Sequence, residues 1–394
     1  MIDSRTDNKN SVAKVSYDDI RPFNDSEVKA AIDSLLGDER FKKTVESIVP
    51  PTSWADFSDE MRQYETITDF QENVIYSLVS RFILNTIDEL QLKNPTNVDL
   101  DQSNTYISNH RDIVLDAALF NILLHEKGYQ TTEVAIGDNL LIYPWITTLM
   151  KLNKCFIVKR GVSIRQIIQV SKHLSNYIHK RVTNDNQGVW IAQREGRAKD
   201  SDDRTQTSLL KMLSLVNSGN PLESLKALNI IPLSISYEYD PCDFLKAKEF
   251  QLKRDFPDYK KTNEDDLINM YTGIIGYKGR VYFKLGRPLK DKIDTISRTQ
   301  HKAEILQEAA NLIDEEIFKK YEFFPHNYVA YDLMNKTEKF TNKYCLKEKE
   351  KFTFYVKKQV DKVNIENKDI DFLKNKIIEM YANTLVNHLS VRKE

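Results

Sequence analysis

TYISNHRDIVLDAALFNILLHEK, residues 105–127, decides the fold class of this chain of 394 residues. It begins with a strand pattern of β-branched and aromatic residues at 105–108, turns through a polar segment, and continues with apolar residues at helical spacing. Further helical patterns lie at 163–181 and 204–217. Short strand patterns alternate with them, at 133–136, 155–159, 189–192, 230–237 and 281–285. This alternation predicts an α/β fold in which helices cover both faces of a sheet.

The sequence on either side of this region reads as helical. A helix is predicted to begin at Asp25 or Ser26, and a second one to cover 70–92, because apolar residues recur at intervals of three and four. Helical patterns return after Thr299. The chain is therefore divided into an N-terminal helical extension (1–74), a central α/β domain (75–298) and a C-terminal helical region (299–394).

The charge and cysteine content narrow the classes of function. Lys and Arg number 57 against 58 Asp and Glu, a formal charge of -1, which argues against binding of nucleic acid by the whole chain. The three cysteines show no metal-binding spacing and fit a reducing compartment, so a cytoplasmic protein without a metal site is expected. The beginning of the chain does not resemble a signal peptide, and no apolar run reaches the length that spans a bilayer.

His110 stands in the polar turn of the opening stretch, with Asp112 two residues and Asp116 six residues further on. A neutral imidazole accepts a proton from a hydroxyl at neutral pH, and a carboxylate on its other ring nitrogen fixes its tautomer. The chain contains neither a G-x-S-x-G nor an H-E-x-x-H motif, so His110 is predicted to activate a hydroxyl of a substrate. A purely structural His–Asp pair is the alternative.

Asp112 and Asp116 are four residues apart and share one helix face. Asp112 lies where the helix is predicted to begin, so capping of free N–H groups explains it. Asp116 lies one turn deeper between Leu115 and Ala117, where a carboxylate is costly to bury without a partner. Asp116 is therefore predicted to be the residue that orients His110.

Cations follow two other predicted strands. Arg160 follows the predicted strand at 155–159. Arg197 and Lys199 follow the predicted strand at 189–192, and Glu195 and Gly196 stand next to them. Arginine presents a planar set of donors that matches a phosphate group, and glycine lets the backbone approach a ligand. Loops that leave the carboxyl ends of parallel strands meet at one edge of the sheet, so an anion site is predicted there, with an exposed salt-bridged surface as the alternative.

Four segments in this order resemble the sequence blocks of the glycerophospholipid acyltransferase family, which includes glycerol-3-phosphate and 1-acylglycerol-3-phosphate acyltransferases. The resemblance covers about residues 100 to 290. The matching segments are Asn109-His110 with a following Asp, Phe156-Ile157 with Arg160, Glu195-Gly196-Arg197, and IPLSISYE at 231–238. Two positions differ from the family: five residues separate His110 from Asp116 where the family has four, and Arg197 follows Gly196 directly.

The resemblance implies an αβα acyltransferase core with a mixed sheet flanked by helices, extended by helices at both ends. It implies that His110 is the general base and that Asp116, or Asp112, orients it. Arg160, Arg197 and Lys199 would hold the phosphate of the acceptor, and Glu195 and Gly196 would shape the pocket. Acyl-CoA or acyl carrier protein would be a co-substrate, and no further cofactor is needed.

The implied acceptor is glycerol 3-phosphate or its 1-acyl derivative, and the implied process is phospholipid synthesis. Two alternatives remain, acylation of another lipid such as an aminolipid and a non-catalytic lipid-binding protein. Peripheral contact with anionic lipid at the inner face of the membrane is also expected. The candidate contacts are the apolar run at 139–150, for which the other interpretation is a buried core segment, and the lysine-rich stretch at 336–362, for which it is a solvated helix face.

Overall fold

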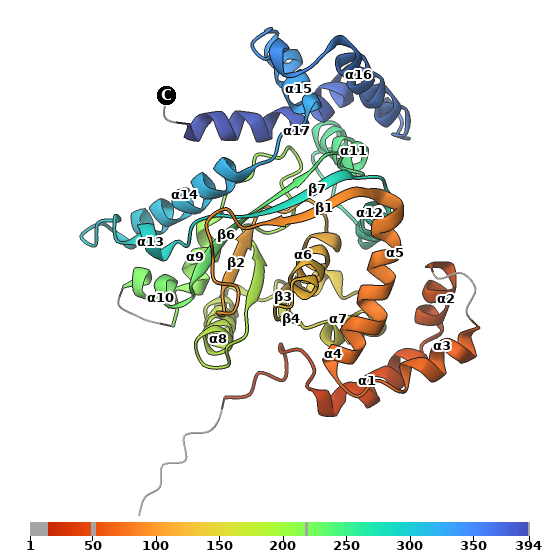
Figure 1. The fold of residues 1–394 in the computed structure, drawn as a ribbon, viewed down its shortest axis with the longest axis vertical. Coiled ribbons are helices and arrows are strands. Elements are labelled where there is room, and N and C mark those ends of the chain that lie inside the picture. The colour runs from red at the N-terminus through yellow and green to blue at the C-terminus, as the bar shows by residue number, and fades with distance from the viewer. Residues whose placement is uncertain (1–14, 49–52, 217–219, 393–394) are drawn as a thin grey trace, which may run out of the picture.

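A seven-stranded mixed sheet forms the centre of the computed structural model, which describes residues 15–48, 53–216 and 220–392 (Figure 1). Its order is β1-β7-β6-β2-β5-β3-β4, and all neighbours are parallel except β6 and β7. The carboxyl ends of β2 to β6 therefore lie along one edge. The strands are β1 (Ile87–Lys93), β2 (Thr105–Ser108), β3 (Glu133–Gly137), β4 (Cys155–Val158), β5 (Val189–Ala192), β6 (Ile230–Tyr237) and β7 (Gly279–Leu285).

Side chains of alternate residues in the strands enter two separate cores. Ile107 and Ile191 pack on one face beneath α8, α9, α10, α13 and α14, whereas Tyr106 and Trp190 pack on the other face beneath α6. This is the predicted αβα arrangement with a mixed sheet. The bounds of these helices are α6 (Leu115–Glu126), α8 (Ile164–Thr183), α9 (Thr207–Leu213), α10 (Pro221–Ala227), α13 (Lys290–Ile293) and α14 (Lys302–Lys320).

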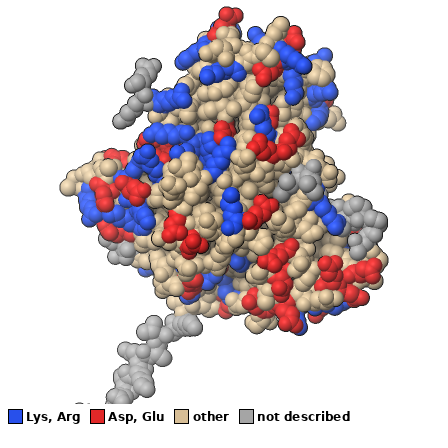
Figure 2. Space-filling view, in the orientation of Figure 1, with Lys and Arg blue, Asp and Glu red and all other residues tan. Residues whose placement is uncertain are grey.

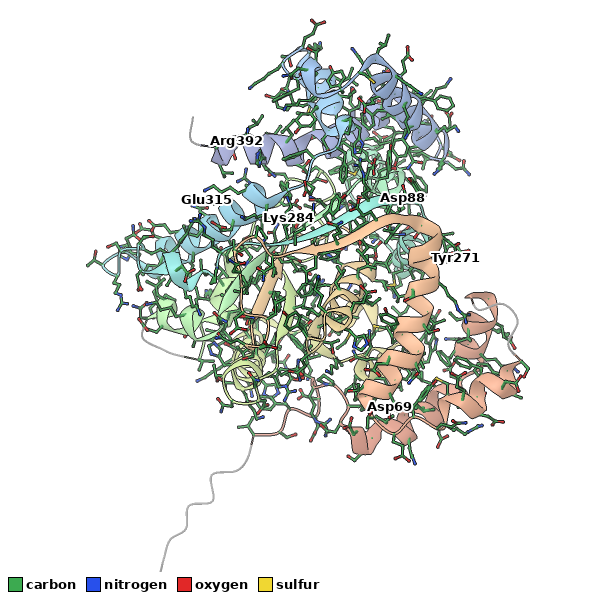
Figure 3. The ribbon with its side chains drawn as sticks, viewed as in Figure 1. Asp69, Asp88, Tyr271, Lys284, Glu315 and Arg392 are labelled. Atoms are coloured by element: carbon green, nitrogen blue, oxygen red, sulfur yellow. The ribbon has the colours of Figure 1, made fainter. Side chains whose placement is uncertain are left out.

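The prediction of one helix over 70–92 is wrong at its end. A helical segment runs through α4 (Ile67–Phe70), η1 (Gln71–Tyr76) and α5 (Ser77–Thr86), and residues 87–93 then form β1. In the described part of the chain, the neighbour of this strand in the sheet is β7, with partners that run from Ile87–Gly279 to Lys93–Lys284. Figure 3 labels Asp88 and Lys284 near the two ends of this strand pair. The partner strand lies far away in the sequence, so local spacing does not reveal it.

Two groups of helices flank the sheet. The N-terminal group packs with α7 around Val28, Phe70 and Leu152, and the C-terminal group packs with α11 around Ala247, Phe352 and Leu373. These helices, with α12 and the short turns, are α1 (Asp25–Leu36), α2 (Glu39–Ile48), α3 (Trp54–Met61), α7 (Pro144–Leu152), α11 (Asp243–Asp255), α12 (Asn263–Ile275), α15 (Pro325–Asn335), α16 (Leu346–Asp361), α17 (Ile370–Val391), η2 (Asp138–Leu140) and η3 (Thr341–Lys343).

The domain boundaries drawn from the sequence fall inside these layers. Position 75 lies within the helical segment that runs from Ile67 to Thr86. Position 299 lies just before α14, whose residues Ile305, Ala309 and Ile313 belong to the core under the sheet. Both flanking parts of the sequence thus contribute to the packing of the central domain.

The distribution of surface charge and the length and polarity of the helices concern the predictions about two partners, nucleic acid and membrane. Figure 2 shows Lys and Arg side chains interspersed with Asp and Glu over the visible face, in keeping with the near-zero net charge. No helix among residues 15–48, 53–216 and 220–392 is both long and apolar enough to cross a membrane.

Candidate active site

The loop after β2 holds His110 at the edge where five strands end. Asn109, the residue before it, is fully buried and bridges to β6 with its side-chain amide. Its Oδ1 accepts a hydrogen bond from the N–H of Ile235 at 2.8 Å, and its Nδ2 donates to the carbonyl of the same residue at 2.9 Å. These two bonds fix the loop between the central strands, so the position of His110 follows from the sheet.

Asp116 engages the ring of His110 from the first turn of α6. Its Oδ2 lies 2.8 Å from Nδ1 of His110 and also accepts the backbone N–H of Arg111 at 2.6 Å and of Asp112 at 3.1 Å. The carboxylate is completely buried, so this contact is little screened by solvent. With Nδ1 bound in this way, Nε2 is the ring nitrogen that remains for a ligand.

Asp112 has a different set of contacts. Its Oδ1 accepts the N–H of Val114 at 2.9 Å and of Leu115 at 2.8 Å, so it caps the start of α6. Burial raises the pKa of the Asp112 carboxyl above its usual value, and the nearby charge of Asp116 adds to that effect. The structure therefore places Asp116 against the imidazole and Asp112 against the helix, and their roles in catalysis stay predictions.

A buried ion pair that the sequence analysis missed supports the same loop. Arg111 Nη2 lies 2.6 Å from Asp203 Oδ2, and the hydroxyl of Tyr321 donates to that same oxygen. Although burial opposes the charged guanidinium, the Asp203 carboxylate holds the pKa of Arg111 above its usual value. The three residues come from distant parts of the chain, so only a lone arginine beside His110 could have signalled the pair in the sequence.

The predicted cations gather beside His110. Arg160 Nη1 lies 3.1 Å from Glu195 Oε1, which joins the loop after β4 to the turn after β5. Gly196 has a φ of +66°, a left-handed conformation that favours glycine. Gly137 is needed for a different reason, because a Cβ atom there would lie 2.6 Å from Nε of Arg160. Glycine at 196 therefore suits the backbone of the turn, and glycine at 137 leaves room for the guanidinium of Arg160.

Arg197 and Lys199 lie on the same wall but differ in their partners. Arg197 is buried, and its Nη2 donates to Oδ1 of Asn269 at 3.0 Å. Among the described residues its Nη1 finds no hydrogen-bond acceptor. Lys199 instead forms an ion pair with Glu249. A buried guanidinium with a free donor is costly unless a ligand supplies the acceptor, so Arg197 has the better geometry for an anion.

A cavity of about 820 Å³ brings these residues together. His110, Arg160, Glu195, Gly196, Arg197 and Lys199 all line it, whereas Asp112 and Asp116 lie behind the histidine. Trp190 also lines it, and its ring packs edge-on against His110 with centroids 5.8 Å apart. The remaining wall is largely apolar and includes Val114, Ala117, Ala118 and Ile122 of α6, Ile75, Leu78 and Val79 of the N-terminal helices, and Ile146, Leu149 and Met150 of α7.

The arrangement suits proton transfer near an anionic group. The cavity has one cationic end, one apolar part, and a histidine that is held by a carboxylate from the first turn of α6. Among the described residues, no group of three or more His, Cys, Asp or Glu side chains is placed to hold a metal ion.

Comparison with known proteins identifies the family. Residues 89–222 match the family model Acyltransferase. This match supports the acyltransferase family for residues 89–222 of the chain. The matched segment contains His110, Asp116 and both cationic loops, so the family suggested by the four sequence blocks is confirmed.

The comparisons with solved structures and with curated proteins say less about this chain than the family model does. One solved structure found is the 1-acyl-sn-glycerophosphate (LPA) acyltransferase PlsC from Thermotoga maritima, which is 12% identical. The match covers 73% of this chain and 95% of that chain, with a TM-score of 0.34. No curated protein matches the sequence.

Proposed function

We propose that this acyltransferase moves a fatty acyl group from acyl-CoA or acyl carrier protein to a hydroxyl of glycerol 3-phosphate or 1-acylglycerol 3-phosphate. The observation that carries the proposal is the position of His110. One ring nitrogen is bound by buried Asp116, and the ring faces a cavity with both a cationic end and an apolar part. An acceptor phosphate and an acyl chain need those two surfaces.

The proton transfer follows from the geometry. Nε2 of His110 would take the proton of the acceptor hydroxyl while its oxygen attacks the carbonyl carbon of the thioester. The carbon–sulfur bond then breaks, and the leaving thiolate receives the proton from the imidazolium. Asp116 would hold the proton on Nδ1 and stabilise the imidazolium between these steps. No covalent acyl-enzyme is required.

The apolar part of the cavity is the proposed place for the acyl chain. Val114, just before α6, and Ala117, Ala118 and Ile122 on one face of α6 line it, and the polar residues Asn121 and His125 of the same face also line the cavity. Val114 and His125 are eleven positions apart, so this side of the cavity is about 16 Å long at 1.5 Å per residue. The wall starts next to His110, where the thioester carbonyl must lie.

Release of free thiol from an acyl thioester tests this function. The purified protein is supplied with acyl-CoA or acyl carrier protein and with one of three acceptors: glycerol 3-phosphate, its 1-acyl derivative, or a non-phosphorylated aminolipid. Thiol release that depends on either phosphorylated acceptor supports the proposal. Release with the aminolipid alone would favour the other acceptor class, and binding of thioester without release would favour a lipid-binding protein.

Arg160→Ala and Arg197→Ala are expected to weaken a phosphorylated acceptor by roughly 10- to 100-fold each. The reason is that hydrogen bonds to charged groups contribute about 1.5–3 kcal/mol. Arg160 is one-third exposed, so its loss is expected at the lower end. The measurement compares kcat/KM for glycerol 3-phosphate with that for glycerol. Arg62→Ala, an exposed arginine outside the cavity, is the control. Equal losses on both acceptors would mean that the arginines serve the fold or the donor.

We also propose that the protein is cytoplasmic and contacts anionic membrane lipid peripherally through α8. Of the two regions suggested by the sequence, 139–150 is partly packed: Trp145 and Leu149 contact the N-terminal core, and most side chains of the run are half-buried. In α8, by contrast, Ile164 is 89% exposed, Ile167 51% and Ile168 71%.

Two features favour lipid as the partner of α8. Its exposed isoleucines stand with the exposed cations Arg165 and Lys172, a combination that suits an anionic bilayer surface. Gly161 to Ser163 connect the helix directly to Arg160 at the cavity, so a lipid product would be released next to it. The lysine-rich stretch, also largely exposed, lies around α16 at the other end of the molecule (Figure 1).

The variant Ile164→Gln/Ile168→Gln is expected to bind anionic vesicles at least about ten-fold more weakly, since burying one such side chain contributes about 1.5–3 kcal/mol. Its melting temperature should not change, because both side chains are exposed. Leu346→Gln is the matched control, a 71% exposed residue at the start of α16. Vesicle flotation measures binding. A loss in the control but not in the α8 variant would move the contact to the lysine-rich stretch.

A further inference from the structure

A second group of cations lines the cavity from elements outside the four sequence blocks. Lys253 belongs to the last turn of α11, and Lys261 lies just before α12. Both line the cavity together with Lys199 from the turn after β5. Residues 253 and 261 also lie outside the segment 89–222 that matches the family model. They are therefore a property of this chain that the motifs do not describe.

At the polar end of the cavity, the carboxylates are fewer than the cations. Glu249 is paired with both Lys199 and Lys253, the latter at 2.9 Å, and Lys261 is paired with Asp266. Among the described residues at the polar end of the cavity, six cations stand against three carboxylates. The cations are Arg160, Arg194, Arg197, Lys199, Lys253 and Lys261, and the carboxylates are Glu195, Glu249 and Asp266.

The three lysines are close enough to affect one another. Partial burial lowers the pKa of Lys199, and although Glu249 opposes this, the charges of Lys253 and Lys261 lower it further. Glu249 is itself largely buried, so it is held in place between Lys199 and Lys253. An excess of positive charge in such a recess favours a bound anion.

The acceptor accounts for only part of this charge. Its single phosphate is assigned to Arg160 and Arg197, on the loops after β4 and β5. A second anion must then come with the other substrate. Thioester donors carry phosphate on the pantetheine arm, and CoA has additional phosphates on its nucleotide. A donor whose thioester reaches His110 would extend its phosphate towards the mouth of the same cavity.

We propose that Lys253 and Lys261, together with Lys199, form an anion subsite for the phosphate groups of the acyl donor. The proposal rests on the function proposed above, because it takes a phosphopantetheine thioester to be the donor. The new element is that the two substrates place their phosphates on different residues. The arginines bind the phosphate of the acceptor, and the lysines of α11 and of the loop after it bind the phosphate of the donor.

The double variant Lys253→Gln/Lys261→Gln tests the subsite. The KM of this variant for a phosphorylated donor is expected to rise roughly ten-fold. The rise would be larger if both lysines were buried, but Lys253 is 52% exposed and solvent screens its charge. Its KM for an acyl-pantetheine thioester, which lacks phosphate, and its KM for glycerol 3-phosphate should stay unchanged. Lys260→Gln is the matched control, since Lys260 is an exposed neighbour of Lys261 that does not line the cavity.

Each outcome is informative. A rise for acyl-CoA alone assigns the lysines to the nucleotide phosphates, and a rise for acyl carrier protein as well assigns them to the phosphate of the pantetheine arm. An equal rise for acyl-pantetheine, or a rise confined to glycerol 3-phosphate, overturns the subsite. If the wild type transfers no acyl group, calorimetry with CoA alone still decides. Weaker CoA binding by the double variant supports the subsite, and equal or absent binding in both proteins overturns it.

Discussion

Replacement of His110 by alanine is expected to reduce acyl transfer by about 100- to 10,000-fold, the usual contribution of a general base. The imidazole is the proton acceptor in the proposed mechanism, and no other histidine is held by a buried carboxylate at the cationic end of the cavity within residues 15–48, 53–216 and 220–392. The fold should survive, because Asn109 and Arg111 fix the loop through their own contacts. Steady-state turnover and a thermal melt together measure the two effects.

His301→Ala provides the control for this experiment. His301 is an exposed histidine before α14 and lies outside the cavity, so its variant should turn over like the wild type. A His110→Ala protein that is folded and keeps more than about a tenth of wild-type turnover would remove the histidine from the mechanism.

Asp116→Asn is expected to lower turnover by at least about ten-fold with little loss of stability. The oxygen that contacts His110 also accepts the N–H groups of Arg111 and Asp112, so an asparagine oxygen can keep all three contacts. What is lost is the negative charge that stabilises the imidazolium in the proposed mechanism. Steady-state turnover and a thermal melt measure the two effects.

Asp112→Asn is the matched comparison on the same helix turn. Asparagine caps a helix about as well as aspartate, and burial already raises the pKa of this carboxyl, so a neutral replacement should be tolerated. This variant is expected to keep most activity. If it loses activity while Asp116→Asn keeps it, the orienting role belongs to Asp112.

Local sequence patterns predicted most of the sheet. Six strands appear where β-branched and aromatic runs predicted them, and β2, β5 and β6 have the predicted bounds. The exception, β1, has the sequence IDELQLK, follows a helix directly and is defined by pairing with a strand about 190 residues later. Sequence spacing therefore succeeds where burial repeats locally and fails where a distant partner decides the structure.

The same distinction holds for the site. His110, Asp116 and the cations of two loops were proposed from short motifs that follow strands, and the structure places them at or beside one cavity, while their roles stay predictions. The loop between His110 and Asp116 has one residue more than in the family. It is accommodated because the N–H groups of Arg111 and Asp112 both point to the Asp116 carboxylate. The sequence analysis missed the Arg111–Asp203 pair, and it also missed Lys253 and Lys261. The reason is that only the fold brings these residues close to the cavity.

The fate of a labelled acyl group tests the central claim most directly. Purified protein is incubated with a thioester carrying a labelled acyl chain and with glycerol 3-phosphate or its 1-acyl derivative, and the labelled products are separated. The account predicts that the label moves into an ester of the acceptor, in proportion to the thiol released, and that His110→Ala forms almost none. Label that accumulates as free fatty acid, or that stays in the thioester with both acceptors, would contradict it.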